Sequence, residues 1–371
     1  RSPGVAGVRE SGDWFGSSLA VGDFDGDGFA DLAIGASGED IGSRKNAGGV
    51  HILYGSESGL QLAGFVFFHG NTKRLPNFAE AGDRFGARLV SADFNGNGYD
   101  DLVIGVPAED LNGVANAGAV LVLRGGTSGV TAEGAMILHQ DVDGVAGSPE
   151  RGDRFGDALA AGDIDGDGHA DLVVGVPGEG LSGNRNAGML HVFSGGPLGL
   201  SGQASTNIHQ DVDGIRGRLH AGDAFASALG VGDVNRDGFA DLAVGVPGES
   251  VGSVADAGVV HVFDGTSAGI TAAGDQVIHQ DSRCIAGKAE AGDRFGSALA
   301  MVDLGGDGRI DVVVGVPHEG LAGKDDVGNI LILPGASRGV SRAASVVLTQ
   351  RSPNTGGNER GDRFGEVFGS S

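Results

Sequence analysis

The chain is poor in cysteine, in aromatic residues and in basic residues. Its 371 residues include one cysteine, Cys284, one tryptophan and two tyrosines, and aromatic residues make up 5% of the total. A single cysteine excludes an intrachain disulfide, so any cross-link that stabilises the fold must be of another kind, and bound metal ions are the obvious candidate. Lys and Arg number 25 against 49 Asp and Glu, which gives a net charge of −24. This charge argues against a nucleic-acid partner, because binding to phosphates needs clustered basic residues.

Two further absences narrow the class of protein. No apolar run reaches 18 residues, so we expect no membrane span, and no signal peptide is recognisable, as in the mature segment of a processed protein. The 73 glycines lack the Gly-X-Y period of collagen and recur at fixed repeat positions. They therefore indicate turns rather than disorder.

One pattern recurs every 70 residues. A Gly-Asp-Arg-Phe-Gly opening, or a close variant, starts at Gly12, Gly82, Gly152, Gly222 and Gly292, and a sixth starts at Gly361, one residue short of the period. A fixed period of this length indicates a solenoid, a propeller or another array of like units. We therefore expect one architecture over residues 1–371. Its repeats are expected at 12–81, 82–151, 152–221, 222–291 and 292–360, with the start of a further repeat at 361–371.

The third repeat shows what each unit contains. Residues 155–163 lead into an acidic loop, and Leu172–Val176 and Met189–Phe193 are short apolar runs bounded by glycine or proline. A fourth strand is expected at Thr206–Gln210. Such runs favour strands over helices, and four antiparallel strands per repeat are typical of the blades of a β-propeller. A linear β-solenoid would need a repeat of about six to nine residues, so the sequence predicts an all-β propeller with five complete four-stranded blades.

Each repeat also carries an acidic loop, and loops 23–31 and 163–171 show its full spacing, Asp-x-Asp-x-Asp-Gly-x-x-Asp. Side chains at positions 1, 3 and 5 can converge in a tight turn, position 7 can add its backbone carbonyl, and position 9 supplies the last carboxylate. Several hard oxygen ligands of this kind suit Ca²⁺. Position 12, where an EF-hand has Glu, falls inside an expected strand, so the loop is not an EF-hand. The predicted ligands are Asp23, Asp25, Asp27, Phe29, Asp31, Asp93, Asn95, Asn97, Tyr99, Asp101, Asp163, Asp165, Asp167, His169, Asp171, Asp233, Asn235, Asp237, Phe239, Asp241, Asp303, Asp307, Arg309 and Asp311.

The five loops are unequal in charge. Loops 23–31 and 163–171 have four Asp each, loop 233–241 has one Asn, loop 93–101 has two Asn, and loop 303–311 has glycine at position 3. Because ligand charge tunes affinity for Ca²⁺, we expect up to five sites, tightest at 23–31 and 163–171 and weakest at 93–101 and 303–311. The alternative is that the loops are only acidic surface turns, which five copies in register disfavour.

Three elements in fixed order resemble a known repeat. Phe155-Gly156, the acidic loop and Gly175-Val-Pro177 are similar to the FG-GAP repeat of integrin α-subunit propellers and their bacterial relatives, whereas Phe225-Ala226 and Gly35-Ala-Ser37 depart slightly from the pattern. The resemblance implies a propeller whose Ca²⁺ ions lie in the hairpin between the first two strands of a blade. The long period looks more like the secreted bacterial members.

The resemblance also bears on the number of blades. Residues 1–12 and 351–361 correspond to two copies of one connecting loop, whereas a ring closed by five blades needs only one. Integrin-like propellers have seven blades. We therefore expect five blades that belong to a longer, seven-bladed ring.

The leading functional hypothesis is a non-catalytic, calcium-stabilised propeller, extracellular or periplasmic, that binds a protein or glycan ligand on one face, as in adhesion. The alternatives are an enzyme that is similar to secreted polysaccharide lyases, and an accessory propeller of a larger secreted enzyme. A catalytic cleft should carry residues that one blade does not share with the others, and Lys73, Arg74 and His318 are the candidates.

A His-Gln-Asp motif also recurs, at 139–141, 209–211 and 279–281. It falls at the expected fourth strand of successive blades, which separates the copies around a ring. We therefore expect a structural role at blade edges rather than a shared metal site.

Overall fold

Strands account for all the regular structure in the described part of the chain. The computed structural model describes residues 10–75, 79–202, 205–321, 323–350, 359 and 361–367, and these contain strands, turns and bends but no helix. The all-β prediction is therefore confirmed. It follows that the described residues contain no apolar helix long enough to cross a membrane.

The strands form five four-stranded antiparallel sheets, each paired in chain order, and one small hairpin. Blade 1 contains β1 (Phe15–Gly22), β2 (Asp31–Ala36), β3 (Gly49–Leu53) and β4 (Val66–Phe68). Blade 2 contains β5 (Arg88–Ala92), β6 (Asp101–Val106), β7 (Ala119–Arg124) and β8 (Thr131–Leu138). Blade 3 contains β9 (Ala158–Gly162), β10 (Asp171–Val176), β11 (Met189–Phe193) and β12 (Ser205–Ile208). Blade 4 contains β13 (Ala228–Gly232), β14 (Asp241–Val246), β15 (Val259–Phe263) and β16 (Gln276–Ile278). Blade 5 contains β17 (Ala298–Val302), β18 (Asp311–Val316), β19 (Asn329–Leu333) and β22 (Val346–Leu348), and the hairpin is β20 (Gly335–Ala336) with β21 (Gly339–Val340).

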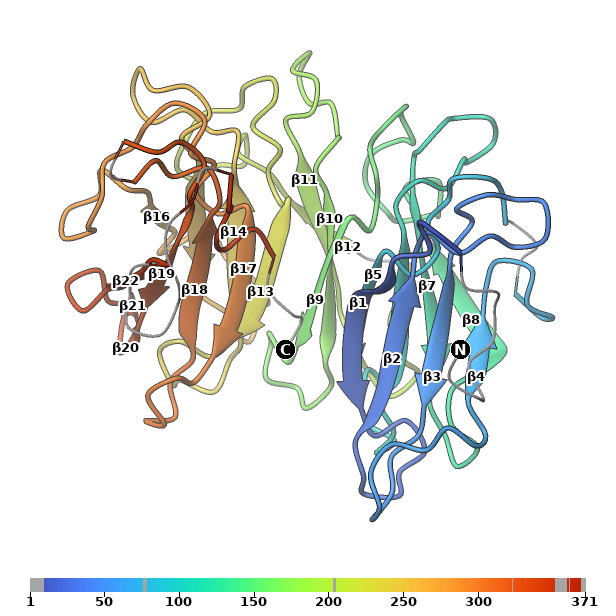
Figure 1. Ribbon diagram of the computed structural model, residues 1–371. Coiled ribbons are helices and arrows are strands. Elements are labelled where there is room, and N and C mark those ends of the chain that lie inside the picture. The colour runs from blue at the N-terminus through green and yellow to red at the C-terminus, as the bar shows by residue number, and fades with distance from the viewer. Residues whose placement is uncertain are drawn as a thin grey trace.

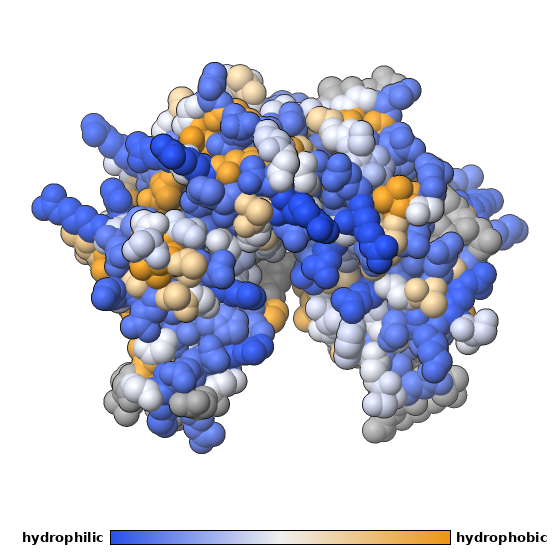
Figure 2. Space-filling model, turned by 90° about the horizontal axis from the view of Figure 1, so that it is seen from above, coloured by the Kyte–Doolittle hydropathy of each residue, from blue (hydrophilic) through white to orange (hydrophobic). Residues whose placement is uncertain are grey.

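The blades stand side by side around a central axis (Figure 1). The first strands β1, β5, β9, β13 and β17 contact one another in sequence and line the centre. Viewed from above, the blades form an open ring with a gap between blade 1 and blade 5 (Figure 2). The propeller with five four-stranded blades is confirmed, whereas the boundaries between repeats and a seven-bladed ring stay predictions. The expectations for residues 1–9, 351–358, 360 and 368–371 lie outside the described residues.

The hydrophobic core lies between the blades rather than within them. Each of four buried clusters combines side chains from two consecutive blades. Phe155, from the opening of blade 3, is fully buried in the cluster that it shares with blade 2, and its backbone N–H donates to the carbonyl of Ala117 at 2.9 Å. Burial of such a ring contributes roughly 1.5–3 kcal/mol. Its counterpart in blade 1, Phe15, is 54% exposed, because no other blade among the described residues packs on that side.

The two rims of the ring differ in what they carry. The hairpin loops between the first and second strands lie on the lower rim in Figure 1, and the Gly-Asp-Arg-Phe-Gly openings lie on the upper rim. The sequence therefore places its acidic loops together on one face of the propeller.

Candidate metal sites

Each acidic loop is folded around the Asp at its first position. In loop 163–171, Asp163 Oδ1 accepts from the N–H groups of Gly166 and Asp167 at 2.8 and 3.1 Å. Its Oδ2 accepts from the N–H of Gly168 at 3.0 Å. A carboxylate that satisfies several consecutive N–H groups fixes a tight turn before any ion is bound. Asp23, Asp233 and Asp303 make the same three contacts, and Asp93 accepts from the N–H groups of Asn95, Asn97 and Gly98.

The Asp at position 9 is buried and ties the loop to the end of the third strand. Asp171 is 2% exposed; its Oδ2 accepts from the N–H of Ile164 at 3.0 Å and its Oδ1 from Gly195 at 2.9 Å. Asp31, Asp241 and Asp311 do the same in their loops. In loop 93–101, Asp101 Oδ1 likewise accepts from the N–H of Gly125 at 2.9 Å, but its Oδ2 accepts from the side-chain amide of Asn95 at 2.8 Å. That contact turns the Asn95 amide toward the buried carboxylate.

Carboxylate oxygens converge in two of the five loops. Oxygens of Asp23, Asp25 and Asp27 lie within 4.8 Å of one another, and so do those of a trio in loop 163–171. The second trio is Asp163, Asp165 and Asp171. In the other loops, over the residues that the structure describes, no three acidic side chains gather in this way. The two loops whose carboxylates converge are those with four Asp each. Their carboxylate oxygens could hold a hard divalent cation.

The remaining predicted ligands are placed as follows. At position 5 a side-chain oxygen accepts from the N–H of the position 7 residue at 2.9 to 3.0 Å, in the pairs Asp27–Phe29, Asn97–Tyr99, Asp167–His169, Asp237–Phe239 and Asp307–Arg309. At position 3, Asn235 Oδ1 is buried and has no hydrogen-bond partner among the described residues. Position 3 of the last loop is Gly305, which offers no side-chain donor.

Neighbouring loops are joined to one another along the rim. The N–H at position 8 of one loop donates to the carbonyl of the first Asp in the preceding loop, as Ala240 does to Asp163 at 2.9 Å. The ring of Phe239 lies against Gly166 so closely that a Cβ there would be 2.8 Å from it, and Gly166 also has a positive φ of 73°. Each of these loops is therefore in direct contact with its neighbour along the rim.

Burial and mutual repulsion both act on the loop carboxyls. Burial, followed by repulsion from Asp167, raises the pKa of Asp165. Burial raises the pKa of Asp171 to about 6 and that of Asp241 to about 7. A cation in the loop would offset this repulsion, which is why the donor set fits a divalent ion.

A second set of buried carboxyls, which the sequence analysis missed, lies near the junctions between blades. After β10, Glu179 is 4% exposed and accepts from the Gln140 side-chain amide of blade 2 at 2.5 Å. Gln210–Glu249 and Gln280–Glu319 repeat this contact across the next two junctions. The contact gives the Gln of the His-Gln-Asp motif a structural role. The signal that could have revealed it is the recurrence of Glu39, Glu109, Glu179, Glu249 and Glu319 at the repeat period.

Glu109 is the exception among these carboxyls. The corresponding Gln position before it is occupied by Gly70, and Glu109 Oε2 is buried without a hydrogen-bond partner among the described residues. Burial, followed by the charge of Asp83, raises the pKa of Glu109 to about 9. Burial raises the pKa of Glu179 and of Glu319 to about 7.

We expect the metal-free protein to lose stability as the pH rises from 5 to 9. A carboxyl whose pKa is raised in the folded state stabilises the fold fully below its unfolded pKa, and this contribution is lost as the pH rises through the folded value. Each raised group contributes a loss of about 1.4 kcal/mol per pH unit between its two pKa values. Urea unfolding in excess chelator at pH 5, 7 and 9 measures the effect, and a flat profile would contradict it. Glu109→Gln should flatten the profile between pH 7 and 9, because Glu109 has a pKa of about 9.

The repeated unit is now defined by its geometry. A Phe-Gly turn inserts into the preceding blade, an acidic hairpin loop follows the first strand, and a Gly in the second strand receives the next Phe-Gly turn. These features define a repeat propeller with candidate metal loops in its hairpins. The chain belongs to the FG-GAP repeat family, which matches residues 15–53, 85–123, 155–193, 225–263 and 295–333.

Relatives with known names share parts of this chain. It is 32% identical over 173 residues to phosphatidylinositol-glycan-specific phospholipase D of Rattus norvegicus, covering 46% of this chain and 19% of that protein. It is 30% identical over 241 residues to integrin alpha-PS2 of Drosophila melanogaster, covering 62% of this chain and 15% of that protein. The chain thus spans less than a fifth of either relative.

The similarity to solved structures is remote. A rhamnogalacturonan lyase of Bacillus licheniformis superimposes with a TM-score of 0.41 at 14% identity, covering 87% of this chain and 49% of that one.

Proposed function

We propose that this protein is a calcium-stabilised propeller that serves as a non-catalytic binding module outside the cytoplasm. The observation that carries the proposal is the acidic hairpin loop, which recurs in all five blades and gathers three carboxylates in two of them. Bound Ca²⁺ would supply the positive charge that these carboxylates lack. Weak sites for Ca²⁺ are typical of extracellular modules, where the ion is present at millimolar concentration, and this supports a secreted or periplasmic location.

Within this proposal, the ligands in each loop are the side chains at positions 1, 3, 5 and 9 and the carbonyl at position 7. The loops at 23–31 and 163–171 bind most tightly, since they hold the gathered carboxylates. The loops at 93–101 and 303–311 bind most weakly, since Asn95 is engaged with Asp101 and Gly305 has no side chain.

The partner in this proposal is a protein or glycan on one face of the ring. The upper rim supports such a surface, because a hollow of about 460 Å³ there is lined by residues that include Trp14, Arg84, Arg88 and Arg154. The Arg84 guanidinium lies 5.5 Å from the centre of the Trp14 ring. Exposed Trp and Arg are enriched at binding surfaces.

Two of the three candidates for a catalytic cleft, Arg74 and His318, have partners of their own, which supports a non-catalytic role. Arg74 pairs with Glu133 at 2.6 Å, and both side chains are exposed. His318 Nδ1 lies 2.9 Å from Asp326 Oδ1. Arg74 follows β4 in blade 1, whereas His318 follows β18 in blade 5.

Calcium titration tests the proposal. Thermal unfolding in millimolar Ca²⁺ should occur at least roughly 10 °C higher than in excess chelator, because several ions each stabilise the folded state by mass action. Isothermal calorimetry should count more than one site and at most five. Mg²⁺ at the same concentration is the control and should stabilise less, because its smaller octahedral shell fits such loops poorly. An unchanged melting temperature would sink the proposal and leave the loops as acidic turns.

A further inference from the structure

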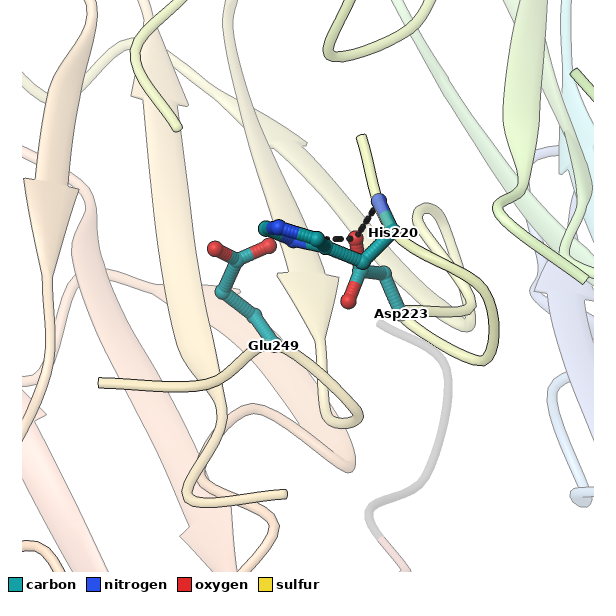
Figure 3. Close-up of side chains that lie close together, drawn as sticks. All are labelled: His220, Asp223 and Glu249. Atoms are coloured by element: carbon teal, nitrogen blue, oxygen red, sulfur yellow. Dashed lines mark hydrogen bonds and ion pairs between the residues drawn. The ribbon is translucent and has the colours of Figure 1, made fainter. Parts of the chain in front are cut away.

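A cluster of three potential metal ligands lies away from the acidic loops, at the start of blade 4. His220 and Asp223 lie in the connection between β12 and β13, and Glu249 lies in the turn after β14. Their side chains point toward one another (Figure 3). The cluster sits on the upper rim, on the opposite side of the strands from the candidate calcium loops.

The donor atoms of this cluster are close enough to share one ion. A His220 ring nitrogen and one carboxylate oxygen each from Asp223 and Glu249 lie within 4.8 Å of one another. His220 Nδ1 is 3.7 Å from Asp223 Oδ2. Ligands bound to a metal at about 2.0–2.2 Å are separated by distances of this order.

The two carboxyls are held in place by other groups. Asp223 is 2% exposed, and its Oδ2 accepts from the backbone N–H of His220 at 2.6 Å. Glu249 is 7% exposed, and its Oε2 accepts from the Gln210 side-chain amide of blade 3 at 2.6 Å. The oxygen of that amide, Gln210 Oε1, is buried and has no hydrogen-bond partner among the described residues. Outer groups that orient the ligands in this way are a regular part of metal sites.

The other blades show what is particular to this one. In other repeats the position of His220 is occupied by Glu80, Glu150 and Glu290. The positions of Asp223 and Glu249 are occupied by Asp and Glu in all five repeats. Within the described residues, these all-acidic counterparts do not bring three donor atoms within the same distance. Blade 4 therefore replaces an acidic side chain with a nitrogen donor, and there the three ligands gather.

We propose that His220, Asp223 and Glu249 bind a divalent transition-metal ion of the Zn²⁺ class. One imidazole nitrogen and two carboxylate oxygens form a mixed donor set that Zn²⁺ accepts, whereas Ca²⁺ and Mg²⁺ prefer oxygen alone. The His220 side chain is 59% exposed, which leaves the ion a path of entry and a position for water.

The buried carboxyls give the site a reason to take up a cation. Oxygens of the buried Asp223 and Glu249 lie within 4.8 Å of each other, and a bound cation would offset the repulsion between the two carboxylates. Because Gln210 belongs to blade 3, the ion would also fasten blade 4 to its neighbour.

Zinc titration of the tag-free protein in saturating Ca²⁺ tests the proposal. Calcium at this concentration competes with zinc for the acidic loops, and because the loops are the same in the wild type and in a variant of the cluster, the comparison of the two does not depend on the proposed function. His220→Glu is the matched variant, because it installs the residue that the other blades carry and should leave folding intact. We expect the wild type to bind one more Zn²⁺ than this variant, or to bind that ion at least about tenfold more tightly.

A second variant distinguishes zinc binding at this site from nonspecific zinc binding by surface histidines. His318→Gln removes another histidine that lies beside a carboxylate, and it should leave zinc binding unchanged. Co²⁺ in place of Zn²⁺ should give visible absorption bands in the wild type and in His318→Gln but not in His220→Glu. Equal zinc binding by the wild type and His220→Glu, or an equal loss in His318→Gln, would overturn the proposal whatever the outcome of the calcium experiment.

Discussion

Replacing Gly245 by alanine is expected to destabilise the protein by about 3 kcal/mol or more. Gly245 lies in β14 of blade 4, and a Cβ there would be 2.0 Å from the carbonyl oxygen of Gly296 in blade 5. That oxygen belongs to the backbone of the Phe-Gly turn, whose N–H is itself bonded to the carbonyl of Gly315 at 3.1 Å. The turn cannot move aside without withdrawing the buried ring of Phe295. Urea unfolding in millimolar Ca²⁺ measures the loss.

The control for this change is a glycine with open space around it. A Cβ at Gly305 would meet no atom nearer than Asp303 Oδ1 at 3.9 Å, and Gly305 is not among the positive-φ glycines. Gly305→Ala should therefore change the free energy of unfolding by less than about 0.5 kcal/mol. Equal unfolding midpoints for the two variants would show that the contact between blades is looser than the structure indicates.

This contact explains why two parts of the repeat occur together. The second-strand glycine of one blade receives the Phe-Gly turn of the next at each junction, in the pairs Gly35–Gly86, Gly105–Gly156, Gly175–Ala226, Gly245–Gly296 and Gly315–Gly365. Ala226 departs from the usual glycine, yet its carbonyl makes the same contact, with a φ of 66°. The contact between blades therefore requires glycine in the second strand, because a Cβ there would collide with the carbonyl oxygen of the next blade.

The strands were predictable because their local signals agree. The run Leu172–Val176 became β10 with one added residue, and Met189–Phe193 became β11 without change. Both runs are mainly apolar, Pro177 follows the first and Gly188 precedes the second, and the five copies of the repeat support the same assignment. The repeat period and the position of each apolar run within the repeat were together enough to predict the four-stranded blade.

The contacts between blades were harder to predict, because they join residues that are remote in sequence. Gln140 and Glu179 are 39 residues apart, and nothing in the local sequence of either indicates the other. Both residues recur at the repeat period, which indicates that the fold requires them. The period does not indicate which residues they contact. The His220 cluster was missed for the same reason, since its signal is one departure from the acidic residue of other repeats.

Replacing Asp163 by alanine is expected to remove the calcium site of loop 163–171 and to destabilise the protein in two separable parts. The first part is the loss of an acceptor for three backbone N–H groups, which costs about 1–2 kcal/mol in an exposed loop. The second is the loss of the ion, which adds about 2.7 kcal/mol when calcium exceeds its dissociation constant by about a hundredfold. Chemical unfolding with calcium and with chelator measures the two parts.

Asp303→Ala provides the comparison that separates these parts. Asp303 accepts from the N–H groups of Gly306, Asp307 and Gly308 just as Asp163 does in its loop, but loop 303–311 gathers no trio of carboxylates among the described residues. In chelator the two variants should lose similar stability, because both lose the same backbone contacts. In calcium the Asp163 variant should lose more, because its site is the stronger. An equal loss under both conditions would mean that the converged carboxylates of loop 163–171 act only as turn acceptors, and that the chain holds its ions elsewhere.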